Sequence, residues 1–127
     1  MLGGLLSYLD KAREHFEAAL LLYSQGFNND AISRLYYSFR SIALFIVGKP
    51  ERGKWRHGAL MRKVVMEVDR RELIPLTREE RRLIKDFASV REDADYELVK
   101  IPDKVVDSYI KLVRKFLEEI GGVKGRG

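Results

Sequence analysis

Apolar residues recur at alternating spacings of three and four along almost the whole chain. The repeat is easiest to follow over about residues 5–24, where its members are Leu5, Leu9, Ala12, Phe16, Ala19 and Tyr23. This spacing places apolar side chains on one face of an α-helix, and no segment shows the strict alternation of a half-buried strand. The pattern therefore restricts the chain to an all-α fold.

Turn and capping residues divide the repeat into separate helices. Gly26 ends the first helix, because glycine readily adopts the backbone conformation that closes a helix. Asn28 or Asn29 can cap the second helix, which is expected to extend to about Gly48. A third helix is expected over about residues 57–71, and its inward residues are Met61, Val64, Val65 and Val68.

Two further helices follow. Thr77 and Glu80 form a capping box for the fourth. Pro102 lies in the first turn of the fifth, where its missing N–H group costs nothing. Because short loops favour antiparallel neighbours, we expect an up-and-down bundle of four to five helices. We expect a single domain over residues 1–120, followed by a flexible tail at residues 121–127.

Composition limits the chemistry of the chain. It has no cysteine, so a disulfide framework and thiolate chemistry are excluded, and we expect no metal or cofactor. Charged residues make up 34% of the sequence, and its only amides are Gln25, Asn28 and Asn29, which indicates a heat-adapted source. The longest apolar run, Ile42–Val47, is too short to span a bilayer, and the N-terminus has no basic flank of a signal peptide. We therefore expect a cytoplasmic protein.

Basic residues are concentrated between Lys49 and Lys63. Six basic residues against one acid, Glu51, leave an excess of five, which equals the whole net charge of +5. Glycine and proline make much of this stretch a loop, and Trp55 lies near its end. Such a loop can contact a phosphate or a nucleic-acid backbone. The alternative is a solvated connection whose tryptophan packs on a neighbouring helix.

The second predicted helix is apolar on more than one face. Its main stripe is Ile32, Leu35, Phe39, Ile42 and Ile46. Tyr37 and Leu44 point nearly opposite this stripe, and Phe45 lies to another side. Burying each large apolar side chain contributes about 1.5–3 kcal/mol. We therefore expect a homodimer with this helix at the interface, the alternative being a monomer with scattered surface apolars.

The run from Val90 to Tyr96, Val-Arg-Glu-Asp-Ala-Asp-Tyr, places charge at the edge of the core. Phe87 lies at the centre of the apolar stripe of this helix, and Arg91 and Asp95 lie one turn apart at its boundary. A guanidinium and a carboxylate in such a position need partners. Those partners are each other, a neighbouring helix, a second subunit or a polar ligand.

Taken together, these segments resemble the HEPN domain, in particular its small stand-alone prokaryotic and archaeal branch. The likeness covers nearly the whole chain and is carried by Tyr23-Ser-Gln-Gly, the run Asn-Asp-Ala-Ile-Ser-Arg-Leu-Tyr-Tyr-Ser from Asn29 to Ser38, His57-Gly58, and the run from Arg91 to Tyr96. The resemblance implies a helical bundle that dimerises and is often encoded beside a small nucleotidyltransferase. Many such pairs behave as toxin–antitoxin modules whose HEPN partner is a metal-independent ribonuclease. Other members bind nucleotides or RNA without cutting them.

The chain departs from the pattern of the cleaving members. Those members carry an arginine followed, after four to six residues, by a histidine, and two copies form one active site. Here Arg91 is present, but Tyr96, Glu97 and Leu98 fill the places where that histidine would fall. A phenol is protonated at neutral pH and is a poor general base. Asp95, if it pairs with Arg91, would be a weak base.

Two functions therefore remain open. In the first, a dimer docks a nucleotidyltransferase and holds a nucleotide or an RNA phosphate near Arg91, with Arg40 and His57 as further ligand-binding candidates. Both candidates have plainer alternatives, Arg40 as a solvent-facing cation and His57 as a helix cap. In the second, Arg91, Asp95 and Tyr96 form the degenerate catalytic site of a metal-independent endoribonuclease. The resemblance also makes Tyr96 a candidate acceptor for a nucleotide transferred by the partner.

Overall fold

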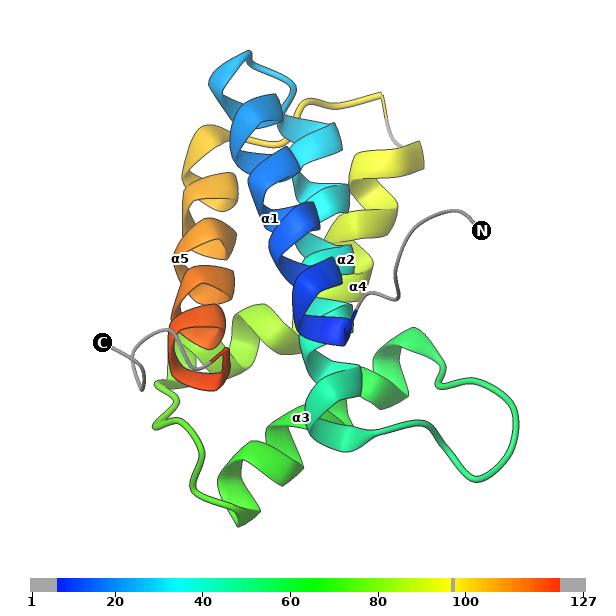
Figure 1. The fold of residues 1–127 in the computed structure, drawn as a ribbon. Helices are drawn as coiled ribbons and strands as arrows, with labels where there is room; N and C mark the ends of the chain where they lie inside the picture. Colours follow the sequence, from blue (N-terminus) through cyan, green and yellow to red (C-terminus); the bar gives the residue numbers. More distant parts are fainter. Residues whose placement is uncertain (1–6, 97, 122–127) are drawn as a thin grey trace, which may run out of the picture.

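The structure of the protein is a computed structural model that describes residues 7–96 and 98–121. Within these ranges the chain forms five helices and no strand, which confirms the expected all-α fold (Figure 1). The helices are α1 (Tyr8–Ser24), α2 (Asn28–Val47), α3 (His57–Arg70), α4 (Arg78–Tyr96) and α5 (Asp103–Ile120). Most of the tail predicted at residues 121–127 lies outside the described residues, as does the start of the predicted first helix.

The helix α2 is the centre of the bundle. It packs against each of the other four helices. Figure 1 shows α1, α2, α4 and α5 side by side, with successive members running in opposite directions. The helix α3, which joins α2 to α4, crosses one end of this group (Figure 1). The loops between α1 and α2 and between α4 and α5 lie at the other end. Within the described part of the chain, no helix combines the length and apolarity needed to cross a membrane.

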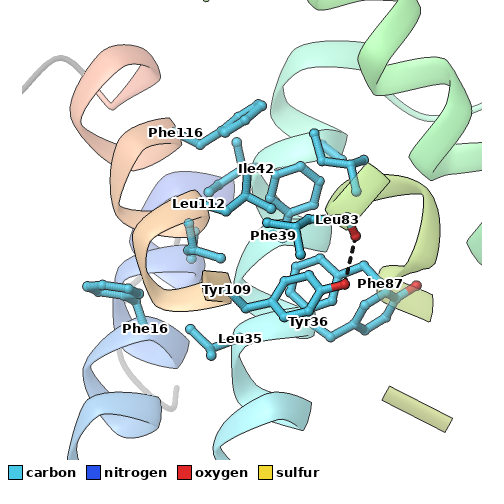
Figure 2. Close-up of a cluster of buried hydrophobic side chains, with 14 of the residues drawn as sticks. Phe16, Leu35, Tyr36, Phe39, Ile42, Leu83, Phe87, Tyr109, Leu112 and Phe116 are labelled. Carbon is cyan, nitrogen blue, oxygen red and sulfur yellow. Dashed lines mark hydrogen bonds between the residues drawn. The ribbon is translucent and has the colours of Figure 1, made fainter. Parts of the chain in front are cut away.

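Aromatic side chains from three helices fill the middle of the core. Phe87 of α4 stacks on Tyr109 of α5, with ring centroids 4.1 Å apart. Its ring also meets Tyr36 at 5.4 Å and Phe39 at 5.6 Å, and all four rings are buried (Figure 2). The Tyr109 hydroxyl donates a hydrogen bond of 2.8 Å to the carbonyl oxygen of Leu83, which satisfies the buried phenol and ties α5 to α4 (Figure 2).

Capping boxes start two of the helices. The predicted box at α4 is confirmed, because Thr77 and Glu80 each bond the other's backbone N–H group through their side chains. A second box, formed by Ser7 and Asp10, starts α1. The helix therefore begins at Tyr8, three residues later than the apolar repeat alone predicts.

The prediction that Asn28 or Asn29 caps α2 is wrong. Both residues belong to the first turn of α2, and their amides bond the connection between α4 and α5 instead. The Asn28 amide donates to the carbonyl oxygen of Ile101 at 2.8 Å and to Oδ1 of Asp103 at 2.7 Å. The Asn29 amide donates to the carbonyl oxygen of Ala94 at 3.1 Å and accepts from the N–H of Ile101 at 2.8 Å. These bonds fix the end of α4 beside α2.

Candidate functional site

Arg91 and Asp95 form an ion pair at the edge of the core. Arg91 is 9% exposed, and its Nη1 donates to Oδ2 of Asp95 at 3.0 Å. The pairing agrees with the one-turn spacing of the two residues on α4. The Nε of Arg91 is also buried and has no hydrogen-bond partner in the structure. Asp95 thus satisfies only part of the guanidinium.

The helix α2 supplies the other side of the site. The Ser33 hydroxyl donates a short hydrogen bond to Oδ1 of Asp95. The guanidinium of Arg91 lies over the ring of Tyr36, 5.4 Å from its centroid, in a cation–π arrangement. Tyr37 meets Tyr36 edge-on, with ring centroids 5.6 Å apart. We call these five residues, Ser33, Tyr36, Tyr37, Arg91 and Asp95, the α2–α4 cluster.

Sequence reasoning did not single out Ser33. A usable signal was present, because Ser33 precedes Tyr36 by three residues and Tyr37 by four, which places all three on one side of a helix. What the pattern could not show is that this side of α2 faces Asp95, which lies 62 residues further along the chain.

The electrostatics of the cluster keep its cation charged and one of its phenols neutral. Burial lowers the pKa of Arg91, but the hydrogen bond to Asp95 and the neighbouring Tyr37 outweigh burial, so this pKa is raised. Burial raises the pKa of Tyr36 to about 12. Near neutral pH, Arg91 is therefore a fixed cation and Tyr36 a hydrogen-bonding phenol rather than a base.

The structure does not bring the other predicted site residues into this cluster. Tyr96 is the last residue of α4 and is 75% exposed, and it makes none of the cluster's contacts. Leu98, at another position where the family's histidine would fall, is fully exposed, and Glu97 lies outside the described residues. His57 opens α3 as predicted, but its side chain is not among those that the structure describes.

Arg40 lies beside the cluster but faces the basic loop. It is close enough to Tyr36 to lower the pKa of that phenol, as Arg91 also does. Arg40 lines a hollow together with Lys49, Lys54 and Trp55. The structure thus places Arg40 between the α2–α4 cluster and the loop that the sequence marked as a candidate phosphate contact.

The exposed face of α2 carries two large aromatic side chains. Tyr37 is 39% exposed and Phe45 is 50% exposed, whereas Leu44 is half-buried. This helix contacts every other helix, so its central position accounts for its buried apolar residues. Its two exposed rings are not explained in this way and are the part of α2 that a second subunit could cover. The expected homodimer stays a prediction.

The described residues show no metal site, and comparisons with known proteins do not identify a family. Among residues 7–96 and 98–121, no three or more His, Cys, Asp or Glu side chains are grouped so that they could hold a metal ion. The likeness to the HEPN domain rests only on the residue runs quoted in the sequence analysis, for the following reason. Comparison with protein-family models, with curated protein sequences and with solved structures found no match to this chain.

Proposed function

We propose that this chain is a HEPN-like helical protein that acts as a homodimer, pairs with a small nucleotidyltransferase, and binds a nucleotide or an RNA phosphate at the α2–α4 cluster. The observation that carries the proposal is the state of Arg91. It is a fixed cation, nine-tenths buried, whose Nε lacks a hydrogen-bond partner. Such a group is costly unless an acceptor completes it. A phosphate oxygen that displaces Asp95 or moves Tyr37 would provide that acceptor.

Binding is better supported than cleavage. Both carboxylate oxygens of Asp95 are engaged, one by Ser33 and one by Arg91, so the carboxylate serves to hold the guanidinium. Tyr96 extends into solvent rather than toward this pair. The two residues named with Arg91 as catalytic candidates are therefore not arranged as an acid and a base around one reacting group.

One observation favours the ribonuclease alternative. His15 of α1 lies beside Tyr37, with ring centroids 6.0 Å apart, and its Nδ1 is 3.3 Å from Nη1 of Arg34. Burial and the nearby Arg34 lower the pKa of His15, so its imidazole is neutral near pH 7. A neutral imidazole next to the cluster is the kind of base that the missing family histidine would have provided.

Dimerisation has a direct test. Light scattering after gel filtration should give twice the chain mass of 14.7 kDa. Phe45→Glu should halve that mass, because it places a charge on the half-exposed face of α2. The matched control is Leu21→Glu on α1, at a residue that is 61% exposed, which should leave the dimer intact. A wild-type protein of monomer mass at high concentration would contradict the interface.

Modification of Tyr96 is tested separately. The exposed phenol is accessible to a partner enzyme, so incubation with a partner nucleotidyltransferase and ATP should add one nucleotidyl group to the protein. Intact-mass spectrometry should detect the addition in the wild type and not in Tyr96→Phe. Tyr23→Phe is the control, since the Tyr23 hydroxyl already bonds Asp107 at 2.8 Å. An unchanged wild-type mass counts against Tyr96 as an acceptor.

A further inference from the structure

A hollow of about 360 Å³ lies between the start of α1, the second half of α2 and the loop that joins α2 to α3. Tyr8 contributes from α1 and Arg40 from α2, and the loop contributes Lys49, Lys54 and Trp55. We call these five residues the loop pocket. It lies outside the run from Arg91 to Tyr96 on which the proposed function rests.

The charge of the loop pocket is not balanced by the protein. Arg40, Lys49 and Lys54 all line it, and none of them forms a salt bridge or hydrogen bond within the described part of the chain. Glu51, the one acid of the basic stretch, is not among the lining residues. Three like charges around one hollow repel one another, and an anion placed between them removes that repulsion.

Arg40 gives a second, independent indication. Its Nη1 is buried and has no hydrogen-bond partner in the structure. Buried nitrogens of charged groups are nearly always bonded, and an unpaired one in a native protein indicates a missing water, ion or ligand. A guanidinium held in this state offers its remaining N–H groups to a bidentate acceptor such as phosphate.

The pocket also has a fixed aromatic wall. The Trp55 indole N–H donates to the carbonyl oxygen of Gly48 at 2.8 Å, which joins the two ends of the loop and holds the indole in place. Tyr8 provides a second ring at the same hollow. Flat rings next to cations suit a ligand that has both a planar and an anionic part, because the ring stacks while the anion is neutralised.

We propose that the loop pocket binds a phosphate monoester that carries a flat ring. In this site Arg40, Lys49 and Lys54 hold the phosphate, and Trp55 stacks on the ring. A 5′-nucleotide has this chemistry, either free or as the 5′ end of an RNA strand. The hollow has the size of small-molecule sites in proteins. The charges of Arg40 and Arg91 both lower the pKa of Tyr36, so the two proposed sites lie on either side of this α2 residue.

The ligand class is tested by titration at physiological salt. Trp55 is the single tryptophan of the chain, so its fluorescence reports on this pocket directly. AMP should quench it and bind with a measurable heat in calorimetry. Inorganic phosphate and adenosine should each bind at least tenfold more weakly, since each lacks one half of the ligand. A short RNA with a 5′-phosphate that competes with AMP, while the same RNA with a 5′-hydroxyl does not, identifies the strand end as a source.

The residues are tested by matched variants. Arg40→Met keeps the stem of the side chain and removes the charge, and it should weaken AMP binding at least tenfold. The double variant Lys49→Ala/Lys54→Ala should do the same, and because both lysines are exposed it keeps the test valid if Arg40→Met does not fold. Arg52→Ala is the control: it removes an equal charge from the same loop outside the lining residues and should change affinity less than threefold.

Three results would overturn the proposal. AMP that fails to bind at millimolar concentration removes the site. If Arg52→Ala lowers the affinity for AMP as much as the double lysine variant does, the nucleotide is attracted by general positive charge and not bound in a pocket. AMP that binds by calorimetry without changing the fluorescence of Trp55 places the nucleotide outside the loop pocket. If Arg91→Ala leaves RNA binding unchanged while the wild type binds AMP at the loop pocket, the result counts only against the proposed function.

Discussion

Arg91→Ala should weaken the binding of a labelled single-stranded RNA about tenfold to a hundredfold, because a hydrogen bond to a charged group contributes about 1.5–3 kcal/mol. The thermal stability should fall little. Asp95 keeps its hydrogen bond to Ser33, and its side chain is 28% exposed, so water can solvate the carboxylate that Arg91 leaves behind. We expect the melting temperature to drop by less than about 5 °C. Fluorescence anisotropy and thermal unfolding measure the two effects.

Arg91→Lys separates charge from geometry. Lysine keeps the positive charge but lacks the planar fork that pairs with a carboxylate and a phosphate together, so the variant should recover only part of the lost affinity. A large drop in melting temperature with unchanged RNA binding, in either variant, would show that Arg91 serves the fold.

The Arg91→Ala variant also tests the ribonuclease alternative. Cleavage of single-stranded RNA in EDTA by the wild type, lost in both Arg91→Ala and His15→Gln, would establish a site built from α1 and α4. Cutting that persists in Arg91→Ala points to a contaminating nuclease. The proposal of a binding protein expects no cleavage in any of the three samples.

Phe87→Ala should lower the free energy of unfolding by about 3–5 kcal/mol, because the truncation leaves a cavity at the centre of the core. Phe87 is fully buried and touches aromatic rings on two other helices, and these rings cannot all collapse into the space. For a chain of this length the melting temperature should fall by about 10–20 °C. Calorimetry or circular dichroism measures the change.

Leu21→Ala is the matched control for Phe87→Ala. It also removes a large apolar side chain from a helix, but Leu21 is 61% exposed. The melting temperature of this variant should therefore stay within about 2 °C of the wild type. Equal losses in the two variants would contradict the arrangement of the core.

The sequence predicts the helices well because their signals are local. The three-and-four repeat, Gly26 and the box of Thr77 and Glu80 each act over a few residues, and the structure has the corresponding helices and ends. The pair of Arg91 and Asp95 was one of four alternatives that the sequence left open, and its one-turn spacing on α4 is again a local signal.

What the sequence could not show depends on packing between distant segments. An asparagine before a helix is normally read as a cap, yet Asn28 bonds Asp103, which lies 75 residues away. Ser33 becomes part of the site only because α2 lies against α4. The position of Arg40 at the basic loop likewise depends on how the loop returns from the end of α2 to α3. No local periodicity carries this information.

The central position of α2 has a consequence for how the molecule opens. Since every other helix packs on α2, we expect the amides of its central turns to exchange with solvent mainly when the whole domain unfolds. The helix α3, whose main contacts are with α2 and α4 alone, can detach by itself at a smaller free-energy cost. Such partial opening would release the loop that begins at Gly48 while leaving Arg91 and Asp95 joined, so the two ends of the protein can fluctuate independently.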